Sequence, residues 1–278
     1  MGYFQAAREG GYAVGAFIAD ALDTMEAVAD ACEQAGLPAV MMAGMATVRF
    51  LGPERYVDLC RSVGRGRSVP VYAHLDHCTD RDLLLQCAGA GFDSVMFDGS
   101  QRPFEENVSI CAGLAGRCHD LGALLEGELG VIAGLEEHVE SAVSRFTDPD
   151  LAEEFVRRTG VDALAVSVGN AHGLYQGKPE LQFPLLEEIA RRCAVPLVLH
   201  GGTGIPGADL RRAVSMGVCK INVGTELRRA YMEAARDYAA REGGTAIGLS
   251  QAIRDRIRPA AARYLEDYRP GGERHAAL

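Results

Sequence analysis

The sequence predicts a (β/α)8 TIM barrel with one additional C-terminal helix. Short β-type runs alternate with amphipathic helical stretches along the chain, as expected of a parallel sheet built from βα units. Eight such units fit in about 250 residues, the usual size of one barrel, and we therefore expect a single domain over residues 1–278. A doubly wound open sheet produces the same alternation and stays the alternative.

Each element can be placed from its own pattern. The expected strands are 12–17, 38–42, 69–74, 94–97, 123–128, 163–168, 197–200 and 220–223. The expected helices, in which apolar residues recur every three or four positions, are 20–35, 53–63, 81–90, 104–121, 149–158, 184–193, 207–216 and 226–241. Asp148-Pro149 and Pro206 are typical helix starts. A last helix is expected at 250–268, and the Gly-rich, polar tail 270–278 is expected to fray.

Composition indicates a soluble globular protein, with 48% apolar and 24% charged residues. No run approaches the roughly 18 apolar residues of a membrane helix, and the start lacks a targeting pattern. We therefore expect a cytoplasmic protein with no membrane partner. A net charge of −10 with dispersed arginines argues against nucleic-acid binding. The eight cysteines form no CxxC pair and lie in apolar runs, so we expect them reduced and buried.

Ionisable and polar side chains gather where the expected strands end, and in a barrel these ends share one rim. In chain order they are His74 to His77, Asp98, Glu126, Glu128, His172, His200 and Asn222 to Thr225. His77 is expected to lie just beyond its strand, whereas His74 and Asp76, two residues apart, share one strand face.

Three of the seven histidines, His77, His172 and His200, reach this rim from three different strands. Three protein ligands that leave a fourth position open are typical of catalytic zinc. Each histidine alone could be a satisfied core or capping residue, but three at equivalent strand ends favour the metal. The other four are interpreted as supporting (His74) or incidental (His119, His138 and His275).

Two loops have the pattern of phosphate sites. The segment 201–206 (GGTGIP) follows an apolar strand and opens a helix, and 222–225 (NVGT) ends the next strand. Backbone N–H groups at such turns and helix N-termini bind anions. A Gly-rich turn alone often only closes an element, but adjacent loops of this kind recur in phosphate-binding barrels.

Seven ordered motifs, within residues 11–231, resemble the class II, metal-dependent ketose-bisphosphate aldolases. They are YAVGAF (12–17), HLDHC (74–78), GFDSVMFDGS (91–100), EGELG (126–130), GNAHGLY (169–175), LHGGTGIP (199–206) and KINVGTEL (220–227). The chain is most similar to the branch with tagatose-1,6-bisphosphate and fructose-1,6-bisphosphate aldolases. The resemblance implies reversible cleavage of such a ketose phosphate to dihydroxyacetone phosphate and an aldehyde such as glyceraldehyde 3-phosphate.

The resemblance also implies roles for residues. His77, His172 and His200 would hold one Zn2+, and Asp76 would move the proton at the aldehyde-derived hydroxyl, with a salt bridge or supporting contact as its alternative. Glu136, in an expected mobile loop 131–144, would deprotonate bound dihydroxyacetone phosphate. That triose would be held by Gly173, Gly201, Gly202, Thr203, Asn222, Val223, Gly224 and Thr225, with a monovalent cation (Na+ or K+) nearby. Asp98 and Glu128 would orient the site or hold a second, displaced metal. Family members are homodimers or homotetramers.

The sequence departs from the family pattern at two positions. Ile18 stands where Asn usually follows Ala-Phe, and Gly224 stands where fructose-bisphosphate enzymes carry Asp or Asn. Both changes remove polar groups that touch the sugar, which should alter specificity. Two other kinds of function compete with this interpretation. An amidohydrolase-like metalloenzyme needs a His-x-His pair that residues 16–20 lack, whereas a sugar-phosphate-binding barrel without catalysis, or an aldolase with a specialised aldehyde acceptor, stays open because of Ile18 and Gly224.

Overall fold

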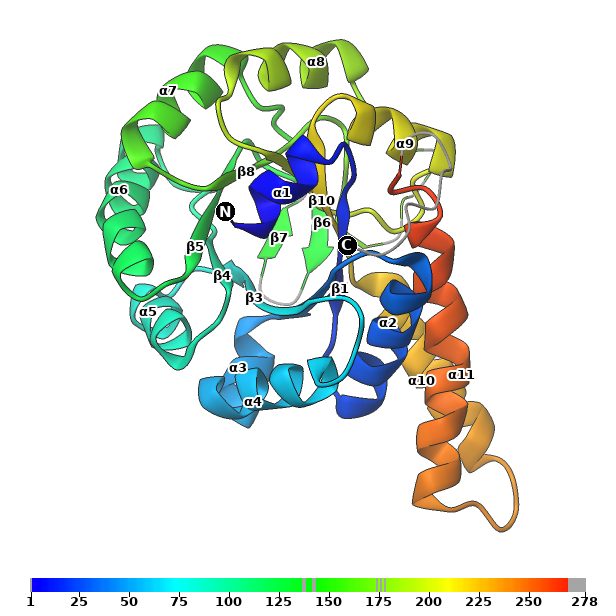
Figure 1. The fold of residues 1–278 in the computed structure, drawn as a ribbon. Helices are drawn as coiled ribbons and strands as arrows, with labels where there is room; N and C mark the ends of the chain where they lie inside the picture. The colour runs from blue at the N-terminus through cyan, green and yellow to red at the C-terminus, as the bar shows by residue number, and fades with distance from the viewer. Residues whose placement is uncertain are drawn as a thin grey trace.

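A closed barrel of parallel strands surrounded by helices forms the molecule in a computed structural model, which confirms the predicted fold class (Figure 1). The structure describes residues 2–136, 139–141, 144–173, 175, 177 and 179–269, without side chains at 135–136 and 139–141. Within these residues the strands neighbour one another in the order β1-β10-β9-β8-β5-β4-β3-β2. They are β1 (Val14–Ile18), β2 (Ala39–Ala43), β3 (Val71–Cys78), β4 (Ser94–Phe97), β5 (Leu124–Leu129), β8 (Ala163–Val166), β9 (Leu197–Leu199) and β10 (Val218–Val223).

Helices cover the outside of the barrel (Figure 1). They are α1 (Tyr3–Glu9), α2 (Leu22–Ala35), α3 (Met45–Leu51), α4 (Pro53–Gly64), α5 (Arg81–Ala90), α6 (Phe104–Asp120), α7 (Pro149–Thr159), α8 (Phe183–Arg192), α9 (Gly207–Ser215), α10 (Thr225–Ala239) and α11 (Ala246–Leu265). Strands buried on both faces read as continuous apolar runs, as in the fully buried AVMMA of β2. The aspartates before α5 and α7 cap these helices by accepting backbone N–H groups.

The structure corrects the third expected strand, which runs 71–78 instead of 69–74. It starts after Pro70, which has no N–H to donate to a ladder. It then continues through His77, so the expectation that His77 lies beyond the strand was wrong. The register with β4 shifts between Leu75 and Cys78, and His77 has a positive φ of 44°. At this bulge, consecutive side chains need not alternate between the two faces of the sheet as they do in a regular strand.

Three other features differ from the expectation. The short helices α1 and α3 were not expected, because each has only 7 residues and shows little periodicity. The expected loop 131–144 contains a hairpin of β6 (Gly134–Glu136) and β7 (Val139–Ser141). The last helix begins at 246 instead of 250, since the Thr245 hydroxyl accepts the Gly248 N–H at 3.1 Å and caps it.

Two peripheral features frame the barrel. Helix α1 lies across one end of it (Figure 1), and its Tyr3 hydroxyl lies 2.7 Å from Ser94 Oγ of β4. Helix α11 packs on α2 and α10, and the α10–α11 pair extends away from the barrel (Figure 1). Across the described residues, no helix combines the length and the apolar character needed to cross a membrane. All eight cysteines are buried and free, as expected.

Candidate metal centre and substrate pocket

The three rim histidines converge on one point. His77 is the penultimate residue of β3, His200 follows β9, and His172 lies in the segment after β8. All three are buried. One ring nitrogen from each lies within 4.8 Å of the others. The rings of His77 and His200 cross at 86° with their centroids 4.6 Å apart. The strand ends therefore bring together the ligand set that the sequence predicts.

Carboxylates orient two of these rings. Asp98 Oδ2 accepts from His77 Nδ1 at 2.9 Å, and Glu126 Oε1 accepts from His200 Nε2 at 2.9 Å. A carboxylate that binds one imidazole nitrogen fixes the tautomer and presents the other nitrogen to a metal. The remaining nitrogens, His77 Nε2 and His200 Nδ1, face each other at 2.9 Å. Two lone pairs cannot face each other at that distance without a proton or a cation between them.

The charges around His77 agree with a cation at this point. Burial alone lowers the pKa of His77, but Asp76, Asp98 and Glu128 together raise it well above its ordinary value. The surroundings therefore favour positive charge at this ring. A metal ion would supply that charge in place of the proton, because metal-bound imidazole is neutral.

Glu128 offers a further ligand atom. His77, Asp98 and Glu128 form a second group with ligand atoms within 4.8 Å of one another. Among the described residues, Glu128 Oε2 is buried without a hydrogen-bond partner, 3.9 Å from His200 Nδ1. Burial raises the pKa of Glu128, and the Asp98 charge adds to this. A buried carboxylate oxygen without a donor usually signals an unseen ion or water, so the residues present fit a bound cation.

Asp76 lies beside the histidines. Its Oδ1 accepts from Asn222 Nδ2 at 3.0 Å, and its Oδ2 is 4.0 Å from His77 Nε2. Burial raises the pKa of Asp76, but the charge of His77 and further neighbours bring it well below the ordinary value. Asp76 is therefore an ionised carboxylate that can accept a proton.

Sequence reasoning missed a buried network beneath the histidines. Lys220 Nζ donates to Glu126 Oε2 at 2.9 Å and to His74 Nε2 at 3.1 Å. All three side chains are fully buried. Burial raises the pKa of Glu126, but the Lys220 charge brings it down to about 2. In the sequence, Lys220 appeared only as the first residue of the motif KINVGTEL. Its direction is shown by its contacts with Glu126 and His74 in the structure.

The two glycine-containing loops lie at the same rim. Gly201 has a φ of +62°, and a Cβ there would lie 2.0 Å from the Ala171 carbonyl oxygen, so only glycine fits. Gly202 N–H donates to the Asn222 carbonyl at 2.8 Å, which ties the loops together. Thr203 is buried beside them. Helix α9 begins directly after the first loop, and α10 begins at Thr225, the last residue of the second. The N-termini of these helices favour an anion.

The remaining predicted site positions lie around these loops. Gly173, with a φ of +81°, follows His172, and Val223 ends β10. Gly224 is the residue that precedes α10, and Thr225 is its first residue.

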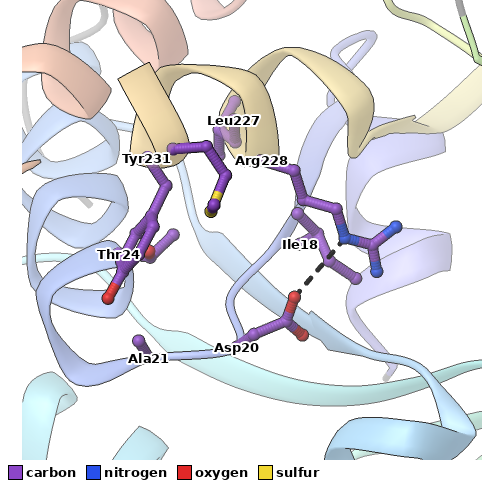
Figure 2. A pocket seen from close by; sticks show the side chains of 8 residues that line it. Ile18, Asp20, Ala21, Thr24, Leu227, Arg228 and Tyr231 are labelled. Carbon is purple, nitrogen blue, oxygen red and sulfur yellow. Dashed lines mark hydrogen bonds and ion pairs between the residues drawn. The ribbon is translucent and has the colours of Figure 1, made fainter. Parts of the chain in front are cut away.

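A pocket of about 400 Å³ opens beside this rim, between β1, α2 and α10 (Figure 2). Its lining includes Ile18, Asp20, Leu227, Arg228 and Met232 but none of the three histidines. Ile18 follows Phe17, which pairs with Val223. The pocket is therefore one strand away from Asn222 and the loop 222–225.

Four predicted positions lie elsewhere or are not described. His119 pairs with Asp162 at 2.8 Å on the exterior. The Glu136 side chain, His138 and His275 lie outside the described part of the chain.

The comparisons with known proteins agree on one family. The family model "Fructose-bisphosphate aldolase class-II" matches residues 2–272. The chain is 40% identical over 230 residues to the D-tagatose-1,6-bisphosphate aldolase subunit GatY of Klebsiella oxytoca, covering 82% of this chain and 81% of that protein.

Solved structures give the same result. The YdjI aldolase from Escherichia coli K12 superposes with a TM-score of 0.84 at 32% identity, over 96% of this chain and 95% of that one. The fructose-bisphosphate aldolase of Campylobacter jejuni has a TM-score of 0.76 at 23% identity, over 95% and 92% of the chains, and supports the fold alone.

Proposed function

The chain belongs to the class II fructose-bisphosphate aldolase family, and we propose that it is a zinc-dependent aldolase that cleaves a ketose phosphate to dihydroxyacetone phosphate and an aldehyde. As a member it is a carbon–carbon lyase. The observation that carries the proposal is the pair of imidazole nitrogens, His77 Nε2 and His200 Nδ1, facing each other at 2.9 Å beside an ionised Asp76.

His77, His172 and His200 would hold the zinc ion, and Glu128 and Asp98 are near enough to support it or to hold it in an alternate position. The chemistry that zinc supplies when bound is Lewis-acid stabilisation of negative charge on substrate oxygens. Asp98 and Glu126 keep two of the imidazoles in the tautomer that a metal needs. No lysine Schiff base is required in this scheme.

Asp76 acts as the general base in cleavage. It takes the proton from the C4 hydroxyl, the C4–O bond becomes a carbonyl, and the C3–C4 bond electrons stay with the triose half as an ene-diolate. A proton then returns to C3 to give dihydroxyacetone phosphate. Glu136 is proposed for the C3 proton on the sequence resemblance alone. Asn222, which donates to Asp76 at 3.0 Å, positions the base.

The triose phosphate is proposed to bind at Gly173, Gly201 to Thr203 and Asn222 to Thr225. The close approach of Gly201 to the segment before His172 and the two helix N-termini support this location. A monovalent cation (Na+ or K+) and a homodimeric or homotetrameric assembly are proposed from the family resemblance. A cytoplasmic location is proposed separately, from the sequence alone.

The experiment is a coupled assay for dihydroxyacetone phosphate released from tagatose 1,6-bisphosphate and from fructose 1,6-bisphosphate, each with and without a chelator. Chelator-sensitive release from either sugar supports the proposal. Zinc retained without release from any ketose phosphate would instead favour the sugar-phosphate-binding barrel, which the residues Ile18 and Gly224 suggested.

A further inference from the structure

The register of β1 and β10 relates the pocket between β1, α2 and α10 to Asp76. Ala16 of β1 pairs with Asn222, whose amide reaches Asp76 inside the barrel. Side chains two residues apart on a strand face the same side, so Ile18 lies on the same row of β1, one step nearer the rim. Gly224 comes after Val223, the partner of Phe17, and therefore lies beside Ile18. As a glycine, it adds no side chain there. The pocket therefore borders the row of β1 that contains Ala16 and Ile18, on the side of α10.

The wall of this pocket is largely apolar. Ile18 is buried, and Ala21, Leu227 and Met232 also line the space. An apolar wall cannot replace the water that a sugar hydroxyl or a phosphate loses on binding. It favours a substrate part that carries few polar groups.

Arg228, the positively charged residue of the pocket lining, forms an ion pair with Asp20. Asp20 Oδ2 lies 3.4 Å from Arg228 Nε, as the dashed line in Figure 2 marks. Asp20 is itself held from α3, because the Thr47 hydroxyl donates to Asp20 Oδ1 at 2.6 Å. A carboxylate fixed in this way offsets part of the positive charge of Arg228 and weakens the attraction of a second anion to it.

We propose that the aldehyde half of the substrate is uncharged and apolar, so that the enzyme uses ketose 1-phosphates with such a tail in preference to ketose bisphosphates. This inference rests on the proposed aldolase function. In the synthetic direction, C3 of the dihydroxyacetone phosphate ene-diolate forms a bond to the aldehyde carbon. The carbonyl oxygen takes the proton from Asp76 and becomes the C4 hydroxyl, while the rest of the aldehyde occupies the pocket. Ile18 and Asp20 are its specificity-determining residues.

The test measures kcat/KM for condensation of dihydroxyacetone phosphate with butanal, glyceraldehyde and glyceraldehyde 3-phosphate, using the zinc-loaded enzyme. We expect the two uncharged aldehydes to exceed the phosphorylated one by about tenfold or more, the scale that one mismatched polar contact produces. A higher kcat/KM for glyceraldehyde 3-phosphate would overturn the inference and leave the aldolase function standing. No product from any aldehyde would overturn both.

Variants separate the two residues. Asp20→Asn keeps the acceptor for Thr47 but removes the charge, and should raise the relative kcat/KM for glyceraldehyde 3-phosphate by about tenfold. Asp23→Asn, which removes the same charge from α2 outside the pocket lining, should leave the ratio unchanged. Ile18→Thr should shift preference from butanal toward glyceraldehyde. Equal ratios in Asp20→Asn and Asp23→Asn would show that Asp20 does not set specificity.

Discussion

Replacing Lys220 by methionine should destabilise the protein strongly, because it leaves Glu126 as a buried carboxylate without its counter-charge. Lys220 Nζ and Glu126 Oε2 are 2.9 Å apart, and both side chains are 0% exposed. Removing one partner of a buried ion pair costs about 3–5 kcal/mol. Burial raises the pKa of Glu126, but Lys220 chiefly brings it down to about 2, below the ordinary 4.5. This difference in pKa corresponds to about 3 kcal/mol in favour of the ionised form. The two estimates agree in size.

The measurement is urea unfolding of the metal-free protein at neutral pH, so that zinc does not contribute to stability. We expect the free energy of unfolding of Lys220→Met to fall by about 3–5 kcal/mol. The double variant Lys220→Met/Glu126→Gln should be more stable than the single variant, because the uncompensated charge is gone. Arg229→Met, which removes an exposed partner of Glu233, is the matched control and should change stability little.

Two results would refute this reasoning. A loss below about 1 kcal/mol in Lys220→Met would mean that Glu126 is neutral or solvated in the folded protein. A double variant whose loss equals the sum of the two single losses would mean that the residues do not interact, since interacting neighbours are not additive.

Four further predictions follow from the site. Asp76→Ala should retain zinc and lose cleavage by about 10²–10⁴-fold, the usual contribution of a general base, and a near-native rate in the coupled assay would contradict the assignment. His200→Ala should bind zinc far more weakly in a chelator competition, and unchanged affinity would remove it from the ligand set. Gly201→Ala should raise KM for the ketose phosphate, because its Cβ would meet the Ala171 carbonyl at 2.0 Å, whereas Gly113→Ala, with open space around it, should not. The pKa of Glu126 in the folded protein, about 2, lies below the ordinary 4.5, so its contribution to stability is present above about pH 4.5 and is lost as pH falls toward 2. In Glu126→Gln, the free energy of unfolding should therefore fall less steeply with decreasing pH in this range. An identical slope in both proteins would contradict the assigned pKa.

The barrel and its rim could be predicted from the sequence because each apolar run ends in polar residues. His200, for example, follows the apolar strand β9 directly, and His172 follows β8 after five intervening residues. Parallel strand ends must share one edge. The expectation that His77 lies beyond the end of its strand was wrong for a local reason. Alternation of residues along a strand gives no sign of a bulge. His77 has a positive φ of 44° where the register with β4 shifts.

Side-chain contacts between segments that are far apart in the sequence could not be predicted from the sequence. Lys220 and Glu126 are 94 positions apart, and Asp20 and Arg228 are 208 apart. Each residue alone resembles an ordinary surface charge. The Asp20–Arg228 pair depends on β1 and β10 becoming neighbours when the barrel closes. The Lys220–Glu126 pair joins β10 to β5, which are not neighbouring strands of the closed barrel. Ile18 was recognised as a departure from the family pattern, but its place in a pocket beside the Asp20–Arg228 pair follows only from the fold.

The central claim is that a zinc ion at His77, His172 and His200 makes this barrel a carbon–carbon lyase. The most direct test is to titrate the metal-depleted protein with zinc while dihydroxyacetone phosphate release from a ketose phosphate is followed. Release that rises to a plateau at about one zinc per subunit, the occupancy of a single three-histidine site, and that is absent in His200→Ala, is the predicted result. Full activity of the metal-depleted protein would contradict the account.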